Sequence, residues 1–442
     1  MGQNLPAPVC VKPAESKVRS IWTNKRLYIA AFLFFNVFIN YTHRVTLSMA
    51  GPAIAKEFSW NPGTMGLIYS SYMWTYVFCI TPWGTLADHI GTRRVNGISI
   101  TMWSIAGVLT GAVTGFLSMM AARLVLGIGE AASFPTCGKV VRQWFPASER
   151  GLATAIFNSG TFAGPAVAAP AVAWLVLHSG WRMAFVITGA TGLVWAALWM
   201  KYFDIPANCS WLPEAEREYI LNGTGGAGKP APKGTLRRLA SRTTMWGLFL
   251  TQGCCAYTMF FYLLWLPSYF VQERHMDLMK ASLFTAVPYL VASVLCVLIG
   301  NLSDRLLTHE GVRQGNRRRL LIVFILLSTM VVLTNVIANQ YAMLVLVCAS
   351  LTCISSALTL NIAMTSDLVW NSSMVGTAIG ISILGGIVFG IAAPIVTGFI
   401  VKSTGSFGYA FYVAGALLLC GVLSLLTMTR QPLSFDEVEE GN

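Results

Sequence analysis

The sequence has 442 residues, of which 55% are hydrophobic and only 11% are charged, and its formal net charge is +12. A soluble domain carries roughly 25% charged residues, so this composition excludes a soluble enzyme or binding domain and predicts an integral membrane protein. The ten cysteines have no CxxC spacing, so neither a metal site nor a disulfide framework is expected.

The apolar residues are grouped in twelve segments, each long enough to cross a bilayer as a helix. They fall at roughly 27–50, 64–86, 96–116, 118–141, 151–176, 182–203, 243–270, 282–302, 319–339, 342–368, 375–400 and 407–429. A polar, Gly- and Pro-rich stretch separates the sixth from the seventh. We therefore expect an all-α fold with a cytoplasmic N-terminal segment at 1–26, a six-helix bundle at 27–203, a cytoplasmic linker at 204–242, a second six-helix bundle at 243–429 and an acidic cytoplasmic tail at 430–442.

Lysine and arginine are unevenly divided between the two sides of this layout. With the N-terminus in the cytoplasm, 23 of the 30 basic residues fall in inner segments and five in outer loops, while Arg44 and Arg123 lie inside apolar segments. Loops rich in lysine and arginine stay on the cytoplasmic side, so both chain ends are expected there, in a membrane that we expect to be the bacterial inner membrane. The basic charge is thus explained by topology and does not indicate a nucleic-acid partner.

A short motif occurs once in each half of the chain. Gly84-Thr-Leu-Ala-Asp88, followed by Arg93 and Arg94, closes the second segment, and Gly300-Asn-Leu-Ser-Asp304-Arg305 closes the eighth. Two parallel repeats with a binding site at their interface are a transporter architecture. We therefore expect two pseudo-repeat bundles around a central cavity.

Ionisable side chains inside the apolar segments mark the candidate site. Arg123 and Glu130 are seven residues apart, and His43 and Arg44 share a helical face with two asparagines. Each such charge costs at least ~2.5 kcal/mol near the bilayer centre, so a binding site or ion pathway is expected. The alternative is an Arg–Glu pair that only holds two helices together.

The chemistry of these residues favours an anionic substrate. Arginine keeps its charge and binds a carboxylate with two hydrogen bonds. Neutral polar groups in several segments suit a polyhydroxylated substrate, whereas an aromatic carboxylate would need fewer, and the tyrosines also fit a plain packing stripe. The candidate substrate-binding residues are Arg44, Arg123, Tyr41, Tyr76, Asn158 and Gln252.

Glu130 is the candidate proton carrier. Burial favours the protonated carboxyl group and a nearby arginine favours the ionised one, so its charge can change with conformation. If Glu130 pairs with Arg123 in the empty site, a substrate carboxylate competes for that arginine, and the released glutamate takes up a proton. His43 either carries a second proton or forms hydrogen bonds as a neutral imidazole.

The repeated loop motif and the six-plus-six layout resemble those of the major facilitator superfamily. That resemblance implies that Asp88 caps a neighbouring helix, contacts basic partners and latches the outward-facing state. Arg93 and Arg94 match the basic positions of the motif, and Asp304 and Arg305 belong to its second copy.

The first segment carries a narrower resemblance. Asn40-Tyr-Thr-His-Arg-Val-Thr-Leu-Ser-Met-Ala50 is similar to the Asn-Tyr-x-Asp-Arg-x-x-Leu-Ser-x-Ala signature of the anion:cation symporters. These include bacterial glucarate, galactarate, galactonate and hexuronate permeases, with sialin and the vesicular glutamate transporters as more distant relatives. The resemblance implies substrate contacts at Tyr41, Arg44 and Tyr76, a further polar contact at Gln252 and a proton carrier at Glu130. The chain departs from the signature at His43, where the bacterial permeases have a proton-carrying aspartate.

The sequence therefore predicts a secondary active transporter and not an enzyme. We expect proton-coupled import of a small organic anion, with a sugar acid ahead of other carboxylates, by a monomer that uses the proton gradient and no cofactor. The alternatives are a transporter of aromatic carboxylates such as hydroxybenzoate or phthalate, an exporter of metabolites or drugs, and a receptor that senses an anion without moving it.

Overall fold

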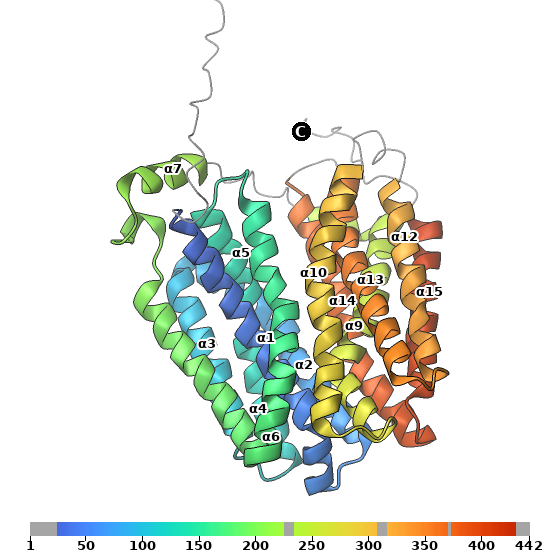
Figure 1. Cartoon of the computed structure of the whole chain (residues 1–442). Coiled ribbons are helices and arrows are strands. Elements are labelled where there is room, and N and C mark those ends of the chain that lie inside the picture. Colours follow the sequence, from blue (N-terminus) through green and yellow to red (C-terminus); the bar gives the residue numbers. More distant parts are fainter. Residues whose placement is uncertain (1–23, 225–233, 307–315, 370–372, 430–442) are drawn as a thin grey trace, which may run out of the picture.

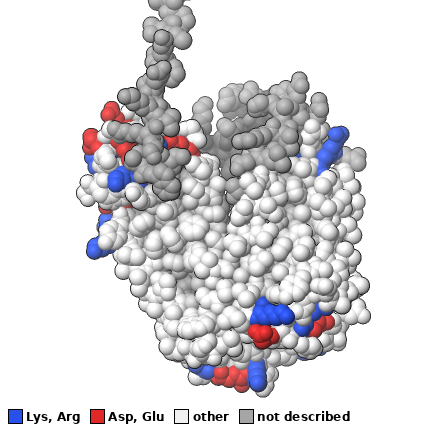
Figure 2. Space-filling view, viewed as in Figure 1, with Lys and Arg blue, Asp and Glu red and all other residues white. Residues whose placement is uncertain are grey.

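The computed structural model describes residues 24–224, 234–306, 316–369 and 373–429, apart from the side chains of 297 and 300–306. Its regular elements are helices, as the composition predicts, because a chain in lipid must satisfy its backbone hydrogen bonds internally. By length and composition, eight helices within the described residues can cross a membrane. Figure 2 shows a surface typical of a membrane protein. A broad belt around the middle is almost free of charged residues, and the charged residues lie toward the two ends of the molecule.

The first half of the chain contains six helical segments of membrane-spanning length, three of which are not among the eight apolar helices counted above, while its longest helix supplies two. They are built from α1 (Arg26–Phe58), α2 (Pro62–His89), α3 (Thr92–Thr110), α4 (Phe116–Glu130), α5 (Ser133–Trp144) and α6 (Arg150–Tyr202). α4 and α5 together form the fourth span, and the break between them follows Glu130. α6 is a fifth and a sixth span that meet at Gly180, whose positive φ of 79° turns the chain.

The second half repeats this arrangement beside the first (Figure 1). Its elements are α9 (Thr243–Gln272), α10 (Leu278–Leu306), α12 (Asn316–Ser328), the 3₁₀ helix η3 (Thr329–Asn335), α13 (Gln340–Leu368), α14 (Val375–Thr404) and α15 (Gly408–Met428). α12 and η3 together form the ninth span, so this half also has six.

The polar stretch between the halves contains helices that the sequence analysis missed, namely η2 (Pro206–Asn208), α7 (Glu214–Thr224) and α8 (Thr235–Ala240). α7 is attached to the first half, because Glu216 accepts hydrogen bonds from the backbone N–H groups of Lys25 and Arg26. Arg26 also forms ion pairs with Glu149 at 2.6 Å and Glu216 at 3.2 Å. We call this end of the molecule the linker side and the opposite end the far side.

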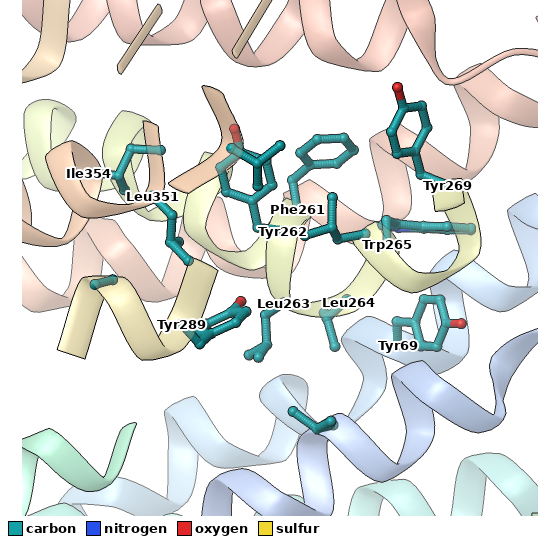
Figure 3. Close-up of a cluster of buried hydrophobic side chains, with 14 of the residues drawn as sticks. Tyr69, Phe261, Tyr262, Leu263, Leu264, Trp265, Tyr269, Tyr289, Leu351 and Ile354 are labelled. Atoms are coloured by element: carbon teal, nitrogen blue, oxygen red, sulfur yellow. The ribbon is translucent and has the colours of Figure 1, made fainter. Parts of the chain in front are cut away.

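The two halves pack tightly against each other toward the far side. The Ser48 hydroxyl donates to the Leu264 carbonyl at 3.0 Å, which joins α1 to α9. The rings of Tyr69 and Trp265 meet edge to face with centroids 5.0 Å apart, and Figure 3 shows them together. A Cβ atom on Gly66 of α2 would lie 2.4 Å from the Pro394 carbonyl of α14. These contacts close the interface between the halves at this end.

Candidate functional site

The centre of the candidate site is an ion pair between Arg44 and Glu130. Arg44 Nε lies 3.0 Å from Glu130 Oε2, and the two side chains are 6% and 0% exposed. Arg44 comes from the middle of α1 and Glu130 is the last residue of α4. Leaving either charge unpaired in this setting would be strongly destabilising, so each side chain depends on the other. The second oxygen, Oε1, has no hydrogen-bond partner in the described part of the chain.

Three tyrosine rings surround the Arg44 guanidinium. Its carbon lies 4.5 Å from the ring centroid of Tyr41, 5.1 Å from that of Tyr72 and 5.8 Å from that of Tyr76. Tyr72 and Tyr76 are one turn apart on α2, so both project toward α1. Cation–π attraction holds the arginine in place while leaving its N–H groups able to donate. The structure thus brings Arg44 together with Tyr41, Tyr72 and Tyr76, the tyrosines that the sequence analysis weighed as substrate contacts or as a packing stripe.

Arg123 does not take the partner that the sequence analysis considered. Its Nη2 donates to Thr110 Oγ1 at 2.9 Å, and its guanidinium lies 5.2 Å from the Phe185 ring centroid. The carboxylate of Glu130 is bonded to Arg44 instead. The reason is geometric: helical side chains lean toward the N-terminus of their helix, so Arg123 reaches away from a residue two turns further along α4.

His43 faces a different part of the first half from its neighbour Arg44. A Cβ atom on Gly107 of α3 would lie 2.9 Å from its Cε1, and one on Gly192 of α6 would lie 3.3 Å from its Nε2. The imidazole therefore occupies a gap that two glycines leave between α3 and α6. Neither ring nitrogen has a hydrogen-bond partner among the described residues, although the side chain is buried.

This placement makes His43→Asn a mild substitution. The ring is not bonded to Arg44 or Glu130, so we expect uptake driven by a pH difference to fall by no more than about tenfold. Uptake at several pH values would measure this, with His178→Asn, an exposed histidine of α6, as the matched control. A His43→Asn protein that binds substrate normally but cannot accumulate it would show that the histidine is an obligatory proton carrier.

Gln252 belongs to a polar cluster in the second half. Asn361 of α13 donates through Nδ2 to Gln252 Oε1 at 2.8 Å and to Ser382 Oγ of α14 at 3.2 Å. The same group also donates to the carbonyl of Leu248 at 3.1 Å. Asn361 is one of the neutral polar groups that the sequence analysis considered for a polyhydroxylated substrate, whereas Ser382 was not predicted, because nothing in its local sequence links it to positions so far away along the chain.

Asn158 belongs neither to the group around Arg44 nor to the polar cluster around Gln252. It lies partly buried on α6, and among the described residues its side chain makes no hydrogen bond. Its backbone carbonyl accepts from the Thr161 hydroxyl at 2.7 Å.

The repeated loop motif lies at the linker side. Asp88 pairs with Lys139 of α5 at 2.5 Å, so it contacts a basic partner at a neighbouring helix, as expected. Arg93 pairs with Asp204 at 2.8 Å, at the start of the polar linker, whereas Arg94 is exposed. Asp304 and Arg305 lie in α10, but their side chains are outside the described part of the chain.

Comparison with known proteins places this arrangement in context. A family model described as Major Facilitator Superfamily matches residues 33–369. A D-galactonate transporter of Escherichia coli O6:H1 is 30% identical over 91% of this chain and 95% of its own length. A probable galactarate/D-glucarate transporter, GudP of Bacillus subtilis, is 32% identical over 95% and 94% of the two chains. A probable sulfoacetate transporter, SauU of Cupriavidus necator, is 33% identical over 88% and 90%.

Solved structures of similar shape have much lower sequence identity. The inward open conformation of the Escherichia coli xylose transporter XylE has a TM-score of 0.72 at 13% identity, over 91% of this chain and 96% of its own. A bacterial homologue of the lysosomal transporter Spinster, inward-facing and unoccupied, has a TM-score of 0.70 at 17% identity over 91% and 95%. At these identities the likeness concerns the fold.

Proposed function

Since the chain belongs to the major facilitator superfamily and is a membrane transporter, we propose that it imports a small organic anion together with protons by alternating access. The proposed substrate is a sugar acid or a related carboxylate, as in the names of the relatives. The observation that carries the proposal is the buried Arg44–Glu130 pair inside three tyrosine rings. The pair offers an anion-binding group and a titratable group in one contact.

The coupling step that we propose is an exchange of partners at Arg44. A substrate carboxylate competes with Glu130 for the guanidinium, because both bind the same N–H groups. Once released, the buried Glu130 carboxylate lacks a counter-charge and takes up a proton, since an unpaired ion is disfavoured in such surroundings. When substrate leaves, Arg44 recovers its partner and the proton departs. Arg123, with its hydroxyl partner Thr110, adds positive potential that favours an anion.

We further propose that the linker side faces the cytoplasm of a bacterial inner membrane, as the distribution of lysine and arginine favours. Residues 27–203 and 243–429 would be the two moving units, joined by the linker at 204–242. We also propose a gating role for the loop motif, because the Asp88–Lys139 and Arg93–Asp204 ion pairs join neighbouring elements at the linker side. The proton gradient supplies the energy without a cofactor, and the functional unit is a monomer.

The test is uptake by the purified protein in proteoliposomes. Labelled D-galactonate should accumulate inside when the outside is acidic, and collapse of the pH difference with a protonophore should stop the accumulation. Liposomes without protein provide the blank. Accumulation only when the pH difference is reversed would indicate export, and tight binding with no movement across the membrane would indicate a receptor.

A further inference from the structure

Among the described residues, the buried Asp, Glu, Lys, Arg and His side chains all come from the first half, whereas the second half has charges near its helix ends, such as the Arg317–Asp367 ion pair between α12 and α13. Within 243–272, 281–303, 320–366, 368–401 and 403–429 the sequence contains no Asp, Glu, Lys, Arg or His. Arg44, Arg123 and Glu130 all lie before residue 203 and are buried. A substrate held between the halves therefore meets ionic groups on one wall only.

The polar side chains buried in the second half are neutral amides and hydroxyls within the described residues. Gln252, Asn361 and Ser382 form one hydrogen-bonded cluster from three helices. Asn361 Oδ1 is buried without a partner in the described residues, as are the hydroxyls of Ser356 and Tyr289. Such groups exchange hydrogen bonds with sugar hydroxyls but supply no positive charge to a carboxylate.

Arg44 and Gln252 are far enough apart to contact opposite ends of one extended substrate molecule. α1 and α9 both run from the linker side to the far side, and the Ser48–Leu264 hydrogen bond fixes their register. Arg44 is four residues before Ser48 and Gln252 is twelve residues before Leu264. The two are therefore separated by about 12 Å along the helix axes, at 1.5 Å per residue, and the long Arg44 side chain leans toward the N-terminus of α1 and covers part of this distance.

Arg123 is not available as a second clamp at the far end of such a molecule. Its guanidinium is bonded to Thr110 and lies over Phe185, both residues of the first half, and the residue is only 2% exposed. A substrate with two carboxylates would place its second charge against the neutral cluster of the second half. A carboxylate desolvated without a cation is strongly disfavoured.

We propose that the transported anion carries a single carboxylate, which Arg44 binds. The rest of the anion is uncharged and bears hydroxyl groups, which form hydrogen bonds with the Gln252–Asn361–Ser382 cluster. The inference rests on the proposed function and narrows its substrate class to monocarboxylic polyhydroxy acids, against dicarboxylic acids of the same carbon skeleton.

A matched pair of ligands tests the proposal. Galactonate and galactarate share their carbon skeleton and hydroxyl configuration and differ at one end, where a CH₂OH group replaces a carboxylate. With the full-length protein, we expect galactonate to compete against labelled galactonate at a concentration at least about tenfold lower than galactarate. Equal competition by the two would overturn the single-carboxylate inference and leave the proposed function standing. If neither competes and neither shifts the melting temperature, the proposed sugar-acid function fails, and the inference fails with it.

A positive charge introduced into the neutral cluster of the second half provides a second test of the proposal. Gln252→Lys should shift the galactonate-to-galactarate preference toward galactarate by about tenfold, because the diacid then gains a partner for its second carboxylate. Gln272→Lys, which changes an exposed glutamine at the end of the same helix, should leave the preference unchanged. If a folded Gln252→Lys protein keeps the wild-type preference between the two ligands, Gln252 and its cluster do not take part in substrate recognition. If that variant does not fold, the comparison of the two ligands on the wild-type protein still decides.

Discussion

Arg44→Lys is expected to reduce uptake roughly 100-fold while the protein remains folded and inserted. Lysine keeps the charge but loses the planar fork, which can donate two parallel hydrogen bonds to a substrate carboxylate. Each charge-assisted hydrogen bond contributes about 1.5–3 kcal/mol, and the loss of a stacked guanidinium removes further attraction to the rings of Tyr41, Tyr72 and Tyr76. The measurement is initial uptake rate at matched protein content, with melting temperature as the check on folding.

Arg182→Lys is the matched control for this prediction. Arg182 also pairs with a glutamate, Glu57 at 2.6 Å, and also lies over an aromatic ring, that of Trp181 at 4.3 Å. Its side chain is 41% exposed at the far side, so the same chemical change should cost transport little. Near-normal uptake by Arg44→Lys would contradict the role of Arg44 as the anion clamp.

The fold class could be predicted from the sequence because lipid restricts the alternatives so strongly. Twelve apolar segments that must satisfy their own backbone hydrogen bonds can only be helices, and the second copy of the loop motif shows that the halves repeat. The family match and the helical structure confirm this expectation. α7 was missed because the stretch looks polar throughout, although Glu214 and Glu216 in its first turn, after a proline, are a typical helix start.

The composition of the site was predictable, but its internal pairing was not. Spacing along a helix tells which residues share a face, so Arg44 and Glu130 could be identified one by one. It does not tell which way a long side chain leans, and this decided that Glu130 meets Arg44 from another helix and not Arg123 from its own. Contacts such as Asn361 with Gln252 and Ser382 join three separate helices, and only the packed bundle reveals them.

Glu130→Gln is expected to separate substrate binding from proton-driven accumulation. The amide has nearly the shape of the protonated carboxyl group and its oxygen still accepts from Arg44 Nε, which now lies 3.0 Å from Glu130 Oε2. Because the amide is permanently neutral, it competes weakly with a substrate carboxylate for the arginine, so binding should be retained within a few-fold. It cannot take up or release a proton, so accumulation driven by a pH difference should fall to the level of empty liposomes.

Exchange of labelled for unlabelled substrate should survive in Glu130→Gln, since the loaded carrier can reorient without releasing a proton. We propose this carboxyl group as the proton site of the wild-type protein because it is fully buried and its Oε1 has no partner in the described part of the chain. Glu57→Gln, which alters a glutamate 42% exposed and paired with Arg182, should keep full accumulation and serves as the control. If Glu130→Gln still concentrates substrate when only a pH difference drives it, the coupling proton binds elsewhere, and His43 becomes the next residue to test.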